Sequence, residues 1–513
     1  MSRKLLQSTA VVSGMTFLSR IFGFVRDMVV ARVFGADEAT DAFIVAFKIP
    51  NFLRRLFAEG AFAQAFVPVF SEYKTQREHD EVKRLADDVA GTLGGILFLL
   101  SLVGVFAAPV IVMIFAPGFI DDEGKFNLTS DMLTITFPYI LFISLTGFAG
   151  SMLNTYERFA VPAFTPVLLN IILISFALWL APLLDEPVMA LAWGVLVAGI
   201  AQLLFQLPYL QQLKLLPRPR WGSKDPGVKR IMTLMLPAIF GSSVAQINLL
   251  LDTVIASFLI SGSVSWLYFS DRLVEFPLGV FGIALATVIL PHLSKNHAES
   301  SPAKFSQTLD WALRWVLVIG MPAMVGLFLL AGPMLTTLFQ YDAFTTHDVE
   351  MATQSLMAYS VGLLGFILVK VLAPGFFARQ DTKTPVKIGI IAMVANMIFN
   401  IILVFPLAHA GLALATSMSA FLNAGLLFYI LKKDEVYKPR PGWPKLFFQV
   451  LVANGLMAAV LIWGAGDLNS WFAWGGMERV IQLFFWVFVG AATYFASVWL
   501  FGLRYRALWG AKG

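Results

Sequence analysis

The residues best suited to chemistry in this chain are cations inside an apolar segment, residues 20–72. The segment is hydrophobic enough to enter a bilayer, yet it carries Arg20, Arg26, Arg32, Lys48, Arg54 and Arg55. A charge near the centre of a bilayer costs roughly 2.5–3.5 kcal/mol on insertion scales. A guanidinium group keeps its charge and donates two hydrogen bonds to one phosphate. These cations therefore predict a polar cavity that binds an anion, and a diphosphate suits the surplus of charge.

A second interpretation is that acids within the membrane neutralise these cations. The acids available are Asp27, Asp41, Glu59, Asp271 and Glu275. Arg272 and Glu275 are three residues apart, a spacing that brings two side chains to one helix face. Both interpretations stay open at this point. We expect at least two of four arginines to contact the ligand, namely Arg20, Arg26, Arg54 and Arg272. Arg55 and Lys370 are outer members of this set of cations.

The composition indicates an all-α polytopic membrane protein. Of 513 residues, 58% are hydrophobic and 13% are charged, whereas soluble domains carry about 25% charged residues. The net charge of +5 is explained by basic cytoplasmic loops, so we expect no nucleic-acid partner. The chain contains no cysteine, which excludes disulfides and thiolate chemistry.

Fourteen segments are apolar and long enough to cross a bilayer, which takes about 20 residues. They are residues 8–33, 38–70, 88–116, 130–154, 162–183, 187–212, 229–259, 263–293, 308–339, 350–377, 386–406, 410–431, 445–465 and 473–503. Alternate loops collect lysines and arginines, whereas the loops between them are neutral or acidic and hold little more than Lys125 and Arg479 as cations. Because cytoplasmic loops are enriched in Lys and Arg, the pattern predicts two cytoplasmic termini.

The chain repeats weakly at a spacing of about 223 residues. Four positions recur: Ala61, Ala63, Pro68 and Ser71 reappear as Ala284, Ala286, Pro291 and Ser294. The repeat predicts two pseudo-symmetric six-helix lobes, residues 1–222 and 223–440, around a central cavity. Residues 441–513 supply two further helices, whose many aromatic side chains suggest either a groove for a lipid tail or an interfacial belt. Arg20 and Arg26 fall on Ser243 and Leu249, so such a lobe does not need the first-helix cations to fold.

Helix breakers and missing motifs narrow the mechanism. Pro50 and Gly60 predict an interruption of the second span, residues 277–279 with Gly282 one of the eighth, and Pro374 with Gly375 one of the tenth. Such breaks are also common without any role. There is no phosphate-binding G-x-x-x-x-G-K motif, no metal-ligand spacing among the five histidines and no catalytic pair of carboxylates. We therefore expect a transporter, not an enzyme, with no cofactor and no metal.

Three long motifs carry a family resemblance. Residues 19–74 (SRIFGFVRDMVVARVFGADEATDAF and onward), 265–285 (SWLYFSDRLVEFPLGVFGIAL) and 369–387 (VKVLAPGFFARQDTKTPVK) resemble the mouse-virulence-factor family of lipid II flippases. That family belongs to the multidrug/oligosaccharidyl-lipid/polysaccharide exporter superfamily. The resemblance implies a cavity formed by Arg20, Arg26, Asp41, Arg54 and Arg272, with the small residues Ala31 and Ser265 near the entrance between the lobes. It also implies that the last two helices form a tail groove.

The resemblance further implies that lipid II, an undecaprenyl-diphosphate disaccharide pentapeptide, is flipped outward across the bacterial inner membrane by alternating access. Other cell-wall synthesis proteins and membrane lipids are candidate partners, the membrane potential is a candidate energy source, and we expect a monomer. Some family members are thought to bind sodium through an acid on the eleventh helix; here that helix offers Asn396 and Asn400 instead. The alternatives are a flippase for another polyprenyl-diphosphate oligosaccharide and, further off, a drug/cation antiporter.

Overall fold

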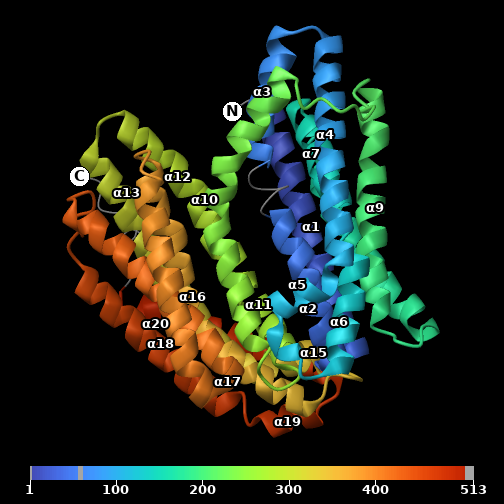
Figure 1. The fold of residues 1–513 in the computed structure, drawn as a ribbon. Helices are drawn as coiled ribbons and strands as arrows, with labels where there is room; N and C mark the ends of the chain where they lie inside the picture. Colours follow the sequence, from blue (N-terminus) through green and yellow to red (C-terminus); the bar gives the residue numbers. More distant parts are fainter. Residues whose placement is uncertain (1–2, 56–61, 503–513) are drawn as a thin grey trace. The chain divides into compact units, whose positions relative to one another are not determined.

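The computed structural model describes residues 3–55 and 62–502, and every regular element in these residues is a helix (Figure 1). The chain divides into two compact units, Met1–Ser265 and Trp266–Gly513. We call them unit 1 and unit 2 and describe each by itself. The all-helical architecture predicted from the composition is confirmed for the described residues.

The described residues of unit 1 form ten α-helices joined by short helical turns and loops. Its helices are α1 (Arg3–Phe34), α2 (Glu38–Arg54), α3 (Ala63–Gln76), α4 (His79–Phe106), α5 (Ala108–Phe115), α6 (Glu123–Thr136), α7 (Tyr139–Thr155), α8 (Ala160–Ser175), α9 (Met189–Gln212) and α10 (Pro226–Ala256). The helix α1 packs along α8, and α7 packs along α9. Stacked rings of Phe62, Phe66 and Phe70 form the centre of one core, with Phe148 edge-on to two of them.

Unit 2 begins within α11 and ends with the last helices of the chain. Its helices are α11 (Ser263–Pro277), α12 (Ile283–Ala298), α13 (Pro302–Trp315), α14 (Met321–Leu329), α15 (Ala331–Phe339), α16 (Thr346–Phe377), α17 (Lys383–Lys433), α18 (Trp443–Gly464), α19 (Leu468–Ala473) and α20 (Gly476–Leu500). The two long helices α16 and α17 run along each other (Figure 1).

Ten helical segments in the described part of the chain are long and apolar enough to cross a membrane. One of them, α17, covers two of the spans predicted from the sequence, residues 386–406 and 410–431. The helix bends between them at Ala408, whose φ of 48° and ψ of −128° are not helical. A Cβ on Gly411 would lie 2.2 Å from the carbonyl oxygen of Leu403, so the bend requires glycine there. The count of fourteen spans stays a prediction.

The predicted helix interruptions have different outcomes. In the second span, α2 continues through Pro50 to Arg54, and Gly60 lies outside the described residues. The break in the eighth span is confirmed, because a π-helical turn, Leu278–Gly282, separates α11 from α12. The break in the tenth span is wrong, because α16 continues through Pro374 to Phe377. Pro374 lies in the last turn of α16, where the missing N–H removes one hydrogen bond at a helix end.

Helix starts in the two units recur at the spacing of the sequence repeat. The helix α4 begins at His79 and α13 at Pro302, 223 residues apart. The same interval separates the starts of α6 and α16 and those of α8 and α17. It also separates Glu157 and Gln380, which both follow a helix end with a left-handed φ of 62°. The helix boundaries therefore support the repeat.

The last helices of unit 2 are held by buried polar groups. The hydroxyl of Tyr494 in α20 donates to the carbonyl oxygen of Val318 at 2.7 Å. Arg479, in the first turn of α20, is buried and donates to four carbonyl oxygens, those of Thr336, Gln340, Trp471 and Phe472. A buried guanidinium group is stabilised only when its N–H groups have partners, so this arginine anchors the start of α20.

Candidate functional site

The most complete polar cluster among the predicted site residues surrounds Asp41, in the first turn of α2. Its carboxylate is 1% exposed and accepts hydrogen bonds from the backbone N–H groups of Gly262 at 2.8 Å and Ser265 at 2.9 Å. The hydroxyl of Ser265 donates to the same carboxylate at 2.7 Å. Asp41 therefore holds the segment that joins α10 to α11. Its partners in this segment all lie in unit 1, and Ser265 is the last residue of that unit.

The fourth hydrogen-bond donor to Asp41 is Lys125, a residue of α6. Its Nζ atom lies 2.9 Å from Asp41 Oδ2, 3.2 Å from the hydroxyl of Ser261 and 4.2 Å from the centroid of the Phe119 ring. Both charged side chains are buried. We call Asp41, Lys125, Gly262 and Ser265 the Asp41 cluster. It is a buried ion pair in which each carboxylate oxygen accepts two hydrogen bonds.

The sequence analysis missed Lys125 as a site residue. The signal was present, because Lys125 is one of the few cations in loops that are otherwise neutral or acidic. A cation that departs from such a loop pattern is a candidate for a buried polar contact, and Asp41 is the acid that the fold brings to Lys125.

Arg26 of α1 is buried and pairs with its neighbour in the chain. Its Nε and Nη2 atoms lie 3.0 Å and 2.6 Å from Oδ1 of Asp27. Its Nη1 atom donates to the side-chain oxygen of Asn170, in α8, at 3.1 Å. The amide of Asn170 also donates to the carbonyl oxygen of Ser19. For Arg26, the interpretation that an acid within the membrane neutralises the cation is therefore correct at least in part.

The other predicted residues of unit 1 have diverse surroundings. Arg20 is exposed and forms no ion pair with any residue that the structure describes. Arg54, near the end of α2, is half-buried, and its Nε atom donates to the side-chain oxygen of Asn51 at 2.8 Å. Arg55 caps the C-terminus of α2 and is also half-buried. Ala31 is fully buried in α1, and Glu59 lies outside the described residues.

The predicted residues of unit 2 include the ion pair that the sequence spacing suggested. Nη1 of Arg272 lies 2.7 Å from Oε2 of Glu275, and Nη2 donates to the hydroxyl of Tyr268 at 3.2 Å. The guanidinium group also lies 4.8 Å from the centroid of the Tyr268 ring. Asp271, which precedes Arg272 in the sequence, is half-buried. Lys370 of α16 is exposed.

No group of three or more His, Asp or Glu side chains in the described parts of the chain is arranged to hold a metal ion. Asn396 and Asn400 of α17 are buried and hydrogen-bonded to each other at 2.8 Å. The amide of Asn396 also approaches the hydroxyl of Thr416 at 3.3 Å. Asn396, Asn400 and Thr416 thus form a hydrogen-bonded chain of side chains.

Comparison with known proteins identifies the family. The family model described as "Lipid II flippase MurJ" matches residues 30–484, which include the Asp41 cluster, Arg54 and Arg272. The chain belongs to this family. Its members named below are transporters, and the recognition made from the three sequence motifs is confirmed.

Relatives in this family match over nearly the full chain. A protein of Vibrio cholerae named "Probable lipid II flippase MurJ" is 48% identical over 99% of this chain and 98% of its own length. A protein of Burkholderia cenocepacia named "Lipid II flippase MurJ" is 44% identical, with 98% of each chain covered.

Solved structures share the fold. One titled "Lipid II flippase MurJ, inward closed conformation" matches with a TM-score of 0.79 at 26% identity, covering 95% of this chain and 99% of its own. An inward-facing multidrug resistance MATE family transporter matches with a TM-score of 0.65 at 15% identity, covering 83% and 98%. The second likeness concerns the fold alone. Together with the ten apolar helices, these matches establish a multi-pass membrane protein.

Proposed function

We propose that this chain flips lipid II, the undecaprenyl-diphosphate disaccharide pentapeptide used for peptidoglycan synthesis, across the bacterial inner membrane from the cytoplasmic to the periplasmic leaflet. The observation that carries the proposal is the near full-length identity of 48% and 44% to relatives named as lipid II flippases. Because about 98% of each relative is matched, the proposal needs no domain that this chain lacks.

In this proposal the diphosphate is bound by Arg26, Arg54 and Arg272, with Arg20 as a further contact. The planar guanidinium group matches two phosphate oxygens at once. The exposure of Arg20 and its lack of an ion-pair partner among the described residues support the assignment, because such a charge is available to a ligand. The undecaprenyl tail stays in lipid or against the last two helices.

The Asp41 cluster acts in this proposal as a latch at the periplasmic end. Asp41 holds two backbone N–H groups and one hydroxyl of the segment that leads into α11. Releasing that carboxylate frees the start of α11, the helix that also carries Arg272. Alternating access then consists of cycles in which this latch closes and opens. The membrane potential supplies about 2.3 kcal/mol per charge for each 100 mV, and we propose it as an energy source.

The function is tested by complementation in bacterial cells depleted of their own lipid II flippase. The wild-type chain should restore growth. Arg20→Ala, Arg26→Ala and Arg272→Ala should each impair it at normal expression in the membrane, with Lys229→Ala, an exposed cation outside the predicted binding set, as the comparison. If all three arginine variants support normal growth, the cation-binding account is wrong.

Native mass spectrometry of the purified protein separates the substrates. Co-purified lipid II supports the proposal. A different polyprenyl-diphosphate oligosaccharide in its place would assign the chain to another flippase activity and overturn the choice of substrate.

A further inference from the structure

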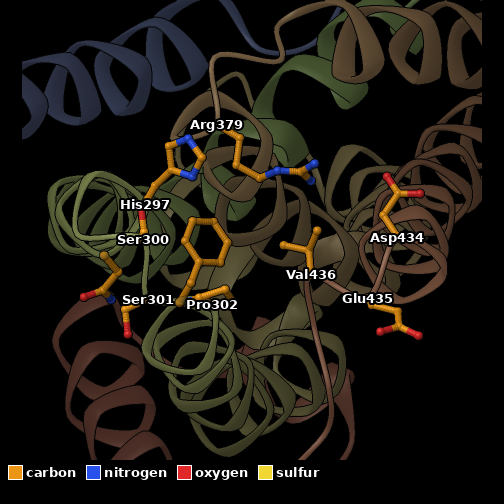
Figure 2. A pocket seen from close by; sticks show the side chains of 10 residues that line it. His297, Ser300, Ser301, Pro302, Arg379, Asp434, Glu435 and Val436 are labelled. Carbon is orange, nitrogen blue, oxygen red and sulfur yellow. The ribbon is translucent and has the colours of Figure 1, made fainter.

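A cavity of about 310 Å³, lined mainly by apolar surface with a few charged and hydroxyl side chains, lies at one end of unit 2, apart from the predicted site residues. Figure 2 shows the side chains around it, which include Arg379, Asp434, Glu435 and the hydroxyls of Ser300 and Ser301. They come from the segments that follow three helices, α12, α16 and α17. The volume is at the lower end of the range for small-molecule sites, about 300–1,000 Å³.

Arg379 and Asp434 carry opposite charges and both line this cavity, but they form no ion pair with each other. The Nη1 atom of Arg379 is buried and has no hydrogen-bond partner among the described residues. The carboxylate of Asp434 makes no ion pair with any residue in the described part of the chain. Glu435 differs, because Lys438 binds its carboxylate at 2.9 Å. Arg379 interacts electrostatically with Asp381, two residues along the chain, but a buried N–H group without a hydrogen-bond partner is destabilising, so the Nη1 group of Arg379 is suited to an anionic ligand.

The ends of three helices favour a positive charge in the same cavity. Each of α12, α16 and α17 is followed by a residue with left-handed φ, namely Ser300 at 50°, Gln380 at 62° and Glu435 at 56°. A helix C-terminus carries a partial negative charge that attracts cations. Asp434 caps the C-terminus of α17. A ligand ammonium group near Asp434 would therefore meet both a carboxylate and the negative end of a helix.

The residues at the equivalent positions of unit 1 differ from those that line the cavity. Arg379 corresponds to Tyr156, and His297 to Lys74, each 223 residues earlier. The Nζ atom of Lys74 lies 4.4 Å from the centroid of the Tyr156 ring and donates to the carbonyl oxygen of Thr155. Leu213 lies 223 residues before Val436 and is half-buried. The residues that line the cavity in unit 2 are therefore not repeated in unit 1.

We propose that this cavity binds a small zwitterion in which a phosphate or carboxylate oxyanion is joined by a short linker to an amine. The oxyanion binds Arg379 and the hydroxyls of Ser300 and Ser301, and the ammonium group binds Asp434. The head group of an ethanolamine phospholipid and a free soluble zwitterion share this chemistry. The binding step is independent of lipid II transport, so it stands or falls separately from the proposed function.

The test is calorimetric titration of the full chain in detergent with O-phosphoethanolamine. We expect saturable binding, and an affinity reduced at least tenfold, about 1.4 kcal/mol, by Arg379→Gln and by Asp434→Asn. Because neither side chain has an ion-pair partner among the described residues, both variants should fold, which their melting curves without ligand will show. Arg158→Gln, an exposed arginine in the corresponding loop of unit 1, is the matched control and should bind like the wild type.

Two further experiments compare parts of the ligand with the whole ligand and a lipid head group with a soluble ligand. Inorganic phosphate and ethanolamine alone should each bind at least tenfold more weakly than O-phosphoethanolamine; equal affinity for phosphate would overturn the zwitterion. The second experiment compares the melting temperature of the protein in nanodiscs of phosphatidylethanolamine and of phosphatidylglycerol. If phosphatidylethanolamine gives the higher melting temperature, and only when Arg379 is present, the ligand is the lipid head group. Without that increase, binding of O-phosphoethanolamine identifies a soluble ligand. Absence of both effects, or binding that ignores both substitutions, refutes the site.

Discussion

Replacing Lys125 by Met should open the Asp41 cluster. The substitution keeps the length and apolar contacts of the side chain but leaves the carboxylate of Asp41, 1% exposed, without a cation. Breaking a buried ion pair from one side costs about 3–5 kcal/mol. Three donors stay on the carboxylate, two backbone N–H groups and the Ser265 hydroxyl, so the low end, about 3 kcal/mol, applies. That is roughly a hundredfold change in the opening equilibrium.

The assay uses the absence of cysteine from the chain. Ser263 is fully buried beside the cluster, and its hydroxyl has no hydrogen-bond partner among the described residues, so Ser263→Cys introduces one thiol at little cost. A maleimide reacts with this thiol only when the segment opens. We expect labelling of Ser263→Cys to accelerate about a hundredfold when Lys125→Met is added.

Two variants control the experiment. Lys229→Met removes an exposed lysine of α10 and should leave the labelling rate unchanged. Asp41→Asn added to Lys125→Met removes the unpaired charge while keeping an oxygen for Ser265, and should slow labelling again. If Lys125→Met labels no faster than Lys229→Met, the ion pair does not hold the segment and the latch is refuted.

Two other predictions concern unit 2. Arg479→Ala leaves four carbonyl oxygens without their donor. Because a charged hydrogen bond contributes about 1.5–3 kcal/mol, this variant should lower the melting temperature by several degrees. Arg479→Lys presents fewer donors and should not restore the melting temperature, so a full rescue by Lys would contradict the assigned contacts. Burial, with Asp310 nearby, raises the pKa of Tyr437 in the loop between α17 and α18. Because the folded pKa exceeds the unfolded value near 10, the stability from protonated Tyr437 is complete below about pH 10 and is lost as pH rises further. Tyr437→Phe should therefore show a smaller fall in melting temperature between about pH 9 and pH 11, and an unchanged alkaline fall would argue against this role.

The sequence predicts the apolar helices and the places where they break, when the signal is local. The π-helical turn after Pro277 coincides with a Pro and Gly cluster, and the bend at Ala408 falls between two apolar stretches. The break predicted at Pro374 was wrong because this proline lies in the last turn of α16, which ends at Phe377. A proline so close to the end of a helix does not interrupt it. Local composition shows that a breaker is present but not how close to the end of the helix it lies.

Partners of the charged residues were harder to predict, because they depend on packing between distant segments. Arg272 and Glu275 are on one helix face, so their spacing was sufficient. Asp41 and Lys125 are 84 residues apart in the chain, and no periodic pattern links them. The cavity of unit 2 also required the structure, because its residues come from the ends of α12, α16 and α17, the start of α13 and the segments that follow these helix ends.

The central claim, that this chain moves lipid II between leaflets, is tested most directly in proteoliposomes that carry fluorescent lipid II in the inner leaflet only. An impermeant quencher added outside reports each head group that reaches the outer leaflet. The account predicts transfer much faster than in protein-free vesicles, and transfer reduced to near that background when Arg26, Arg54 and Arg272 are all replaced by Ala. Transfer by the wild-type chain at the rate of protein-free vesicles, or equally fast transfer by the triple variant, would contradict it.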